Sequence, residues 1–327
     1  MKRREFITLL GGAAAWPRPL RAQSNPPATL RIAAASPTPR TAPSSFLRPF
    51  LARMEELGYI DGKTMVVDFN DLQGNTDRYP EAWRGLVAQK PDVIVAYGPE
   101  ASLKAAMAAT QTIPIVMVAI DYDPLVLGHV TSLARPIGNV TGLFLQQIEL
   151  AAKRIEMLRD AFPALKGVHV FWDAQSADQW QASKTSADKL GLQITGIEMR
   201  NYPYDYEKAL AQVPLEHRRF LIVLTSPFLA RDRERLADFA MQKRIGSMFV
   251  FREDAALGGL MAYGPSRIKL YGRAADYVNR IARGARPGDL PIERPTIFEL
   301  AINLKIAKAI GMEFSQATLL RADQVIE

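Results

Sequence analysis

Residues 92–118 read DVIVAYGPEASLKAAMAATQTIPIVMV and contain a complete strand–helix–strand pattern. Two short apolar runs, at 92–97 and 113–118, flank an alanine-rich stretch at 100–111 that has the composition of a helix. Apolar runs of this kind are typical of strands buried on both faces of a parallel sheet, where a crossover helix joins neighbouring strands. The segment therefore predicts an α/β fold.

The same alternation extends outward in both directions. Before the quoted segment, the pattern predicts strands at 30–35 and 64–69 and helices at 46–57 and 79–90. After it, the pattern predicts strands at 167–172, 192–199, 220–224 and 247–251 and helices at 143–162, 176–190, 204–213 and 228–244. Two such series in one chain indicate two similar lobes, each a parallel sheet flanked by helices. A less regular third section, with strands at 260–263 and 296–304 and a helix at 266–283, is expected to complete these two lobes.

The N-terminus has the three regions of a signal peptide in order. The paired arginines Arg3 and Arg4 precede an apolar stretch at 6–16, which is too short to span a bilayer, and small residues follow. The arginine pair indicates the twin-arginine route, with cleavage near Ala22. Residues 1–22 are therefore predicted to be a signal peptide, and the mature protein is expected in the periplasm. The competing interpretation is a cytoplasmic protein with a basic N-terminus.

The sequence has no cysteine, which excludes a lipobox, disulfides and cysteine-held metals. No other segment reaches the length of a membrane span, so the mature protein is expected not to be membrane-anchored. The formal net charge is +7, but the first 22 residues contribute five basic residues and one acidic residue. The rest is only mildly basic and has no Lys/Arg run that resembles a nucleic-acid patch, so nucleic acid is not an expected partner.

Sequence motifs for catalysis are missing. The residues after the first predicted strand, 36–40, read SPTPR and contain no glycine, unlike a dinucleotide-binding loop. The chain has no Walker A sequence, no nucleophile elbow and no His-Glu-x-x-His pair, and its three histidines lie far apart. The sequence therefore predicts a protein that is not an enzyme and that uses no cofactor and no metal.

Polar and aromatic residues follow the predicted strands, where parallel α/β sheets bind their ligands. The ligand-binding candidates of the first lobe are Ser36, Gly98, Glu100, Ser102, Tyr122 and Asp123, and Asp121 follows the same strand as the last two. Those of the second lobe are Trp172, Asp173, Ser226 and Phe228, and Tyr263 follows the returning strand. Hydroxyls, carboxylates and rings in this combination suit a small polar or zwitterionic organic solute. Each also has a structural interpretation, as a helix cap, a turn residue or a packing residue. On the ligand-binding interpretation, Trp172→Ala is expected to weaken binding with little loss of stability.

The order and spacing of several motifs resemble a known family over nearly the whole mature chain. The most specific stretch is residues 132–142, SLARPIGNVTG. The other matching stretches are ELGY at 56–59, PDVIV at 91–95, IPIV at 113–116, DP at 123–124, GGLM at 258–261, YG at 263–264, FEL at 298–300 and NLK at 303–305. On these residues the chain resembles ABC-type substrate-binding proteins of the tryptophan/tyrosine-transport-related group, which have the type I periplasmic-binding fold.

The resemblance implies two Rossmann-like lobes that are joined by a three-strand hinge and close around a solute. With crossovers near Leu143, Ala255 and Leu290, it places 28–142 and 255–290 in the first lobe and 143–254 and 291–327 in the second. It further implies a monomer that delivers its solute to an ABC permease with its ATPase.

Two departures from the family pattern leave the solute open among an amino acid, an aromatic compound and a carboxylate. The first loop is rich in proline, and Trp172-Asp173 stands where the family often has Asn-Pro. Two other functions remain as alternatives: a ligand-binding subunit that serves a sensor or signalling partner, and an exported α/β enzyme.

Overall fold

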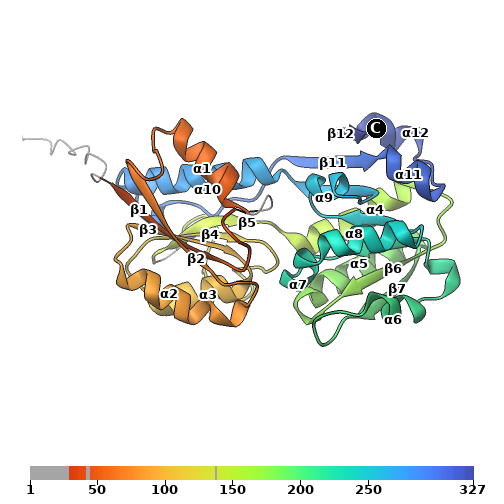
Figure 1. Ribbon diagram of the computed structural model, residues 1–327, viewed down its shortest axis with the longest axis horizontal. Helices are drawn as coiled ribbons and strands as arrows, with labels where there is room; N and C mark the ends of the chain where they lie inside the picture. The colour runs from red at the N-terminus through yellow and green to blue at the C-terminus, as the bar shows by residue number, and fades with distance from the viewer. Residues whose placement is uncertain (1–28, 42–44, 137) are drawn as a thin grey trace, which may run out of the picture.

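The computed structural model describes residues 29–41, 45–136 and 138–327, so the predicted signal peptide at 1–22 lies outside the described residues. Two separate β-sheets, each flanked by helices, form two lobes that lie side by side (Figure 1). The alternation of buried strands and amphipathic helices expected from the sequence is therefore present in both halves of the molecule.

The first sheet has five strands in the order β2-β1-β3-β4-β5, and all its pairs are parallel. Its strands are β1 (Leu30–Ser36), β2 (Met65–Asp71), β3 (Val93–Gly98), β4 (Ile115–Ala119) and β5 (Val140–Phe144). β3 and β4 are the two apolar runs of the segment at 92–118. Both strands are almost wholly buried, as expected for strands that are covered by helices on both faces.

Helices cover both faces of the first sheet. They are α1 (Leu47–Glu56), α2 (Tyr79–Ala88), α3 (Glu100–Ala109) and α10 (Arg267–Ala282). α1 and α10 lie on one face and α2 and α3 on the other (Figure 1). Phe50 and Tyr271 belong to the apolar core under the first pair, and Trp83 and Leu103 belong to the core under the second.

The second sheet has seven strands in the order β12-β11-β10-β9-β8-β6-β7. Its strands are β6 (Gly167–Trp172), β7 (Gln193–Glu198), β8 (Phe220–Val223), β9 (Gly246–Phe249), β10 (Met261–Pro265), β11 (Phe298–Asn303) and β12 (Gln324–Ile326). The pairs are parallel except β10 with β11, which run antiparallel, so this sheet is mixed rather than wholly parallel.

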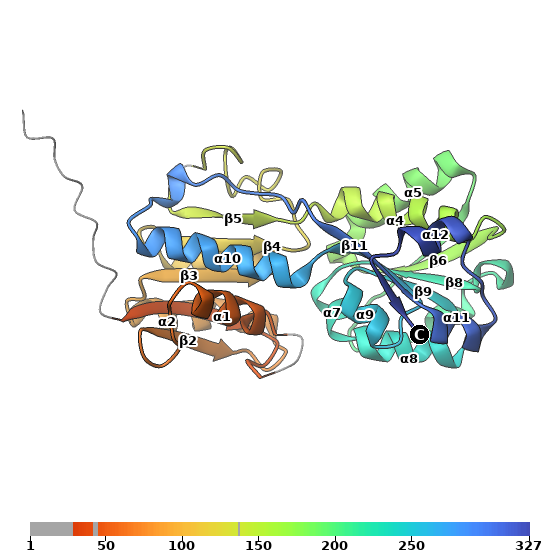
Figure 2. The same ribbon diagram turned by 90° about the horizontal axis from the view of Figure 1, so that it is seen from above.

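The helices of the second lobe are α4 (Gln147–Ala161), α5 (Ala177–Leu190), α6 (Tyr206–Ala211), α7 (Pro227–Arg231), α8 (Arg233–Gln242), α9 (Arg252–Ala256), α11 (Leu304–Ile310) and α12 (Gln316–Arg321). Short 3₁₀ turns occur in both lobes: η1 (Thr76–Arg78) and η4 (Pro287–Asp289) in the first, and η2 (Ala174–Ser176) and η3 (Leu215–His217) in the second. Figure 2 shows α4 and α5 on one side of the sheet and α8 and α11 on the other.

Two details of the sequence-based organisation are wrong. The helix expected at 143–162 starts only at Gln147, because residues 140–144 pair with β4 as strand β5 and Gln146 adopts a left-handed conformation (φ 54°). The sequence-based division places the strand at 261–265 in the first lobe, but this strand pairs with β9 and β11 in the second sheet. The second crossover therefore lies near Ser266 rather than near Ala255.

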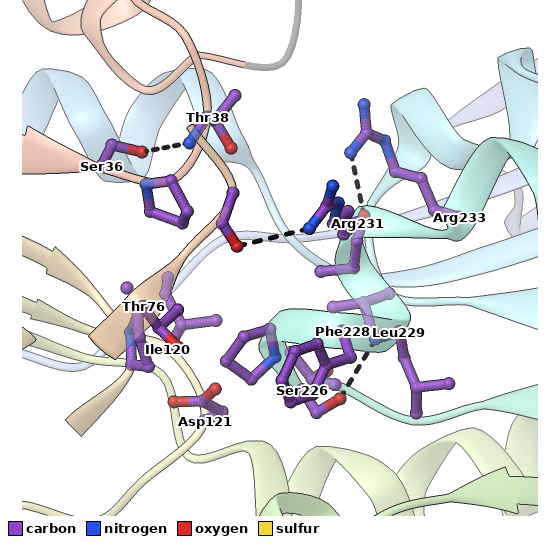
Figure 3. Close-up of a pocket in the computed structure, with 18 of the residues that line it drawn as sticks. Ser36, Thr38, Thr76, Ile120, Asp121, Ser226, Phe228, Leu229, Arg231 and Arg233 are labelled. Atoms are coloured by element: carbon purple, nitrogen blue, oxygen red, sulfur yellow. Dashed lines mark hydrogen bonds between the residues drawn. The ribbon is translucent and has the colours of Figure 1, made fainter. Parts of the chain in front are cut away.

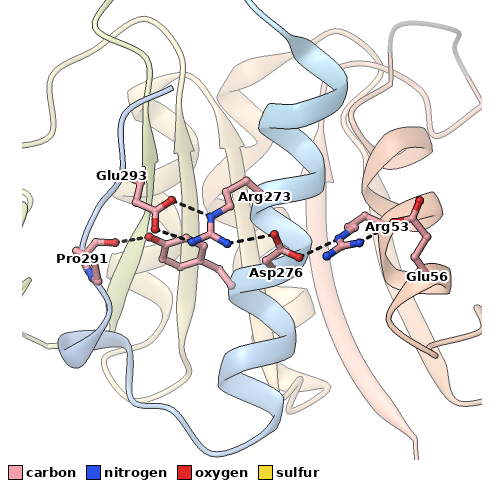
Figure 4. A network of polar contacts seen from close by, with 7 residues as sticks. Arg53, Glu56, Arg273, Asp276, Pro291 and Glu293 are labelled. Carbon is pink, nitrogen blue, oxygen red and sulfur yellow. Dashed lines mark hydrogen bonds and ion pairs between the residues drawn. The ribbon is translucent and has the colours of Figure 1, made fainter. Parts of the chain in front are cut away.

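The chain crosses between the two sheets three times, between β5 and α4, between β10 and α10, and after η4 on the way to β11 (Figure 2). A chain of charged contacts fixes the last segment to the first lobe (Figure 4). Arg273 of α10 donates two hydrogen bonds to Glu293, of 2.8 and 2.7 Å, and a third to Asp276. Asp276 also accepts a 2.9 Å bond from Arg53 of α1. The segment that follows α10 is therefore held against the first lobe as far as Glu293, and we assign it to that lobe.

In the described part of the chain, no helix has both the length and the apolar character needed to cross a membrane.

Candidate functional site

A cleft of about 500 Å³ lies between the lobes, at the carboxyl ends of strands from both sheets (Figure 3). One wall is built from the loops that follow β1, β2, β3 and β4. The other wall is built from the end of β8, from α7, from the start of α8 and from the end of β9, with Arg267 of α10 at the second crossover. Parallel strands bring their carboxyl ends to one edge of a sheet, so the two edges face each other across this cleft.

Ser36 and Asp121 mark the first wall. Ser36 ends β1, and its hydroxyl accepts a 3.0 Å hydrogen bond from the backbone N–H of Thr38, which shapes the loop that lines the cleft. Asp121 lies just beyond β4 and also lines the cleft. Burial raises the pKa of Asp121 to about 7, with smaller contributions from the nearby acids Asp173 and Glu100. Near neutral pH this carboxyl group is poised between its charged and its neutral form.

Ser226 and its neighbours form the second wall. The Ser226 hydroxyl caps α7 by accepting a 3.2 Å bond from the Leu229 N–H, and it donates a hydrogen bond to Asp173. Phe228 stacks on Tyr202 with ring centroids 4.9 Å apart, which presents an aromatic surface at the cleft. The hydroxyl of Thr225 is buried and has no hydrogen-bond partner among the described residues. This wall therefore presents an aromatic ring to the cleft, and it contains a buried hydroxyl group without a partner among the described residues.

Arg231 reaches across the cleft to the first lobe. Its guanidinium donates a 3.3 Å hydrogen bond to the carbonyl oxygen of Gly74 and lies over the ring of Tyr202. Gly74 has a positive φ of 78°, and a Cβ atom there would lie 2.7 Å from the Arg231 Nη1 atom. The backbone conformation favours glycine here, whereas the Arg231 guanidinium, at the end of a long flexible side chain, could move aside for a Cβ atom.

Arg233, Asp254 and Arg267 meet on the second wall of the cleft. The Nε of Arg233 and the Nη2 of Arg267 lie 3.7 and 3.9 Å from the same oxygen of Asp254, beyond hydrogen-bond length. That oxygen has no hydrogen-bond partner in the described part of the chain, and burial raises the pKa of Asp254. Arg267 also stacks on Phe251, with its guanidinium carbon 4.1 Å from the ring centroid. These groups can form new hydrogen bonds to a polar solute without first breaking strong ones.

The sequence-based candidates separate into two sets. Those that line the cleft are Ser36, Gly98, Ser226 and Phe228. Those that lie outside its lining are Glu100, Ser102, Tyr122, Asp123, Trp172, Asp173 and Tyr263. Most residues of the second set have structural partners instead, but the buried hydroxyl of Ser102 has no hydrogen-bond partner in the described part of the chain.

Several candidates from the first lobe stabilise the long loop after β4. Glu100 pairs with His129 at 2.8 Å, and Tyr122 packs edge-on against the same imidazole. Asp123 accepts hydrogen bonds from the N–H groups of Leu125 and Val126 as a turn residue. Ser102, also of the first lobe, is fully buried in α3.

The other candidates belong to the second lobe. Tyr263 stacks on Phe298, and its carbonyl oxygen accepts a 2.8 Å bond from Arg154. Asp173 is 3% exposed and accepts hydrogen bonds from the hydroxyls of Ser226 and Tyr204. Asp173 thus meets the cleft lining through its hydrogen bond with Ser226.

Sequence reasoning missed the arginines of the cleft. The acids Asp121 and Asp254 each follow a predicted strand, where ligand-binding residues are expected. Arg231, Arg233 and Arg267 lie on helices, where reading only the ends of strands does not look. These arginines could have been found by also examining the helices that directly follow β8 and β10.

We expect Trp172→Ala to lower stability rather than ligand affinity. Trp172 stacks on Trp180 of α5, with ring centroids 6.1 Å apart and planes at 12°. Removing the partly buried ring should cost about 2–3 kcal/mol, measured by urea denaturation, with little change in affinity by calorimetry. Phe228→Ala, the matched variant inside the cleft, should show the opposite pattern. An affinity loss for Trp172→Ala equal to that of Phe228→Ala would return Trp172 to the binding site.

These features define a class of protein: binding proteins that hold a solute between two α/β lobes connected by several crossovers. Over residues 47–326 the sequence matches the family described as ABC transporter substrate binding protein, and the chain belongs to this family. The family resemblance noted in the sequence is confirmed.

Relatives and solved structures agree with this assignment. A tyrosine-binding protein of Clostridioides difficile is 25% identical over 273 residues, which cover 81% of this chain and 76% of the relative. A conserved domain protein of Vibrio cholerae has a TM-score of 0.81 at 24% identity, covering 91% of this chain and 99% of its own. The ABC domain from Streptococcus pneumonia, solved in complex with L-Trp, has a TM-score of 0.79 at 21% identity, covering 91% and 100%. The expected type I periplasmic-binding fold is confirmed.

Proposed function

We propose that this chain is the non-catalytic solute receptor of an ABC importer, and that it captures a small organic solute by closing its lobes over the cleft. The observation that carries the proposal is the cleft itself. Its walls come from the strand ends of two different sheets, so a solute between them contacts both lobes only when they are close together. Such differential contact is what allows a ligand to favour the closed form.

The contact between Arg231 and the Gly74 carbonyl supports this movement. It joins the lobes at the cleft by one hydrogen bond at the long end of the normal range. A contact of this kind is too weak to hold the lobes shut alone, since a net hydrogen bond contributes about 1 kcal/mol. The solute therefore supplies the larger part of the closing free energy.

The proposal extends to location and partners. The signal-peptide pattern at 1–22 directs the mature chain to the periplasm, and the lack of cysteine leaves no site for a lipid anchor. There the closed receptor, as a monomer, presents its solute to a permease with its ATPase. Family membership supports these partners.

The solute is an amino acid, an aromatic compound or a carboxylate. The cleft combines an aromatic surface at Phe228 with arginines and acids on its walls. A tyrosine-binding relative and the likeness to a structure in complex with L-Trp make L-tyrosine and L-tryptophan the first solutes to test.

Calorimetry, thermal unfolding and small-angle scattering together test the receptor function. A bound solute at 100-fold its dissociation constant should add about 2.7 kcal/mol to the free energy of unfolding. The radius of gyration should fall on binding, because the lobes approach each other. Chemical turnover of the bound compound would overturn the receptor assignment, and binding with an unchanged radius of gyration would overturn closure.

A further inference from the structure

Asp121 is a carboxyl group in the cleft without a basic partner. The charged groups that act on it are two further acids, Glu100 of the first lobe and Asp173 of the second, and both raise its pKa. A hydrogen bond from its own backbone N–H favours the negative charge but does not outweigh burial. The cations of the cleft, Arg231, Arg233 and Arg267, belong to the opposite wall. An ionised Asp121 therefore attracts a cation into the cleft.

The neighbouring groups are already engaged or uncharged, which leaves Asp121 as the free acceptor. Glu100 is paired with His129, and the Asp173 carboxylate accepts the hydroxyls of Ser226 and Tyr204. Tyr79 and Tyr122 pack close to Asp121, and burial raises the pKa of each phenol well above its usual value, so both are neutral. These groups cannot neutralise the Asp121 carboxylate.

A second, independent observation points to a ligand in the same cleft. The side chain of Thr225 lies on the opposite wall, and the residue is 5% exposed. Its hydroxyl has no hydrogen-bond partner among the described residues, although a buried hydroxyl without a partner costs free energy. A polar solute between the walls would meet the Asp121 carboxylate on one side and, on the other, a wall whose buried hydroxyl still lacks a partner.

We propose that Asp121 receives a protonated amine of the captured solute. This inference rests on the proposed receptor function and narrows its solute class to compounds that carry an ammonium group. A solute with a carboxylate but no amine would pair with the arginines of the opposite wall, Arg231, Arg233 and Arg267, but would leave Asp121 without a partner. In the first lobe, the solute is then recognised by Asp121, just beyond β4, rather than by residues of the proline-rich loop after β1.

The assignment has a consequence for pH. Because burial raises the pKa of the Asp121 carboxyl to about 7 in the empty cleft, it is largely protonated at pH 5.5 and cannot pair with an ammonium. Binding of the amine stabilises the ionised form, so capture releases a proton. Affinity for an amine should rise as pH increases from about 5.5 to 7, by up to tenfold per unit, and level off above about pH 8.

The test uses three probes that share one ring: L-tyrosine, tyramine and 3-(4-hydroxyphenyl)propanoate. Tyramine lacks the carboxylate and the third probe lacks the amine. In calorimetry, wild-type protein should bind L-tyrosine and tyramine, and should bind the acid more weakly than L-tyrosine. Asp121→Asn should lose at least about 30-fold in affinity for the amines and lose the pH dependence, because one partner of a charge pair in the cleft is gone. Asp123→Asn, two residues away and outside the cleft lining, should change neither.

The outcomes distinguish this inference from the receptor function. Binding of 3-(4-hydroxyphenyl)propanoate as tight as that of L-tyrosine, or unchanged amine affinity in Asp121→Asn, would overturn the role of Asp121 and leave a receptor. A thermal-shift panel of the amino acids, their decarboxylated amines and their deaminated acids extends the comparison to other side chains. Stabilisation by acids alone would likewise overturn only the amine assignment, whereas stabilisation by no compound would overturn both proposals. Asp121→Glu, which keeps the charge, should retain a pH-dependent affinity and exclude a merely structural role.

Discussion

Gly142→Ala should lower the free energy of unfolding by more than about 4 kcal/mol or prevent folding. Gly142 lies in the middle of β5 with a φ of 134°, a conformation that residues with a side chain rarely adopt. A Cβ atom there would lie 2.0 Å from the carbonyl oxygen of Met117 and 2.7 Å from its nitrogen. Both atoms belong to the backbone of the neighbouring strand β4, so no side chain can move aside. Urea denaturation, or the yield of folded protein, measures the result.

Gly85→Ala provides the matched control. Gly85 lies inside α2, and a Cβ atom there meets nothing within 4 Å. The same added methyl group should therefore be neutral or should stabilise the protein by up to about 1 kcal/mol through helix propensity. If Gly142→Ala unfolds at the same urea concentration as Gly85→Ala, the close approach of β5 to β4 is not as described. The result also gives a physical reason for the glycine that ends the SLARPIGNVTG stretch.

Asp173→Ala should lower the free energy of unfolding by about 2–4 kcal/mol, since it removes the acceptor from several buried donors at once. Its carboxylate accepts the hydroxyls of Ser226 and Tyr204, the latter at 3.0 Å, and the N–H of Gln175 at 3.1 Å. The hydroxyls would remain buried without an acceptor. Because Ser226 lines the cleft, ligand affinity should also fall, but only as a consequence of its displacement.

Asp178→Ala controls for the loss of a negative charge in this region. Asp178 is exposed in the first turn of α5, and its removal should change stability by less than about 0.5 kcal/mol. Denaturation of both variants, with calorimetry at a temperature where each is folded, separates the two roles of Asp173. Full stability of Asp173→Ala together with lost affinity would show that Asp173 binds the solute directly, as the sequence suggested.

The fold was largely predictable because buried parallel strands have a strong apolar signal. The segment at 92–118 behaves as its pattern predicts, with β3, α3 and β4 in order. The signal failed at β5, where Leu143 and Phe144 continue the apolar stripe of the next helix and nothing in the pattern separates them. It also failed to assign Met261–Pro265 to a lobe, because an apolar strand does not reveal which sheet it joins. That choice depends on its pairing with β9, which is a tertiary contact.

The cleft was less predictable for a geometric reason. Residues at the end of a strand point alternately to opposite faces of the sheet, so only some of them turn toward the other lobe. Ser36 and Ser226 do, whereas Trp172 turns onto α5 and Asp173 turns back into its own loop. Arg233, Asp254 and Arg267 lie on three different helices, α8, α9 and α10, and come together only in the folded structure. The spacing of these residues along the sequence does not predict this contact.

The triple crossing of the chain has a consequence for biosynthesis. The first sheet is complete at Phe144, but α10, which covers one of its faces with Leu270 and Tyr271, starts only at Arg267. During translation the strands therefore leave the ribosome long before their covering helix. One apolar face of the first sheet therefore stays uncovered while the second lobe is synthesised. Exposed apolar surface of this kind promotes aggregation, which chaperones prevent. Each lobe is built from separate segments of the chain, so neither lobe corresponds to one contiguous fragment.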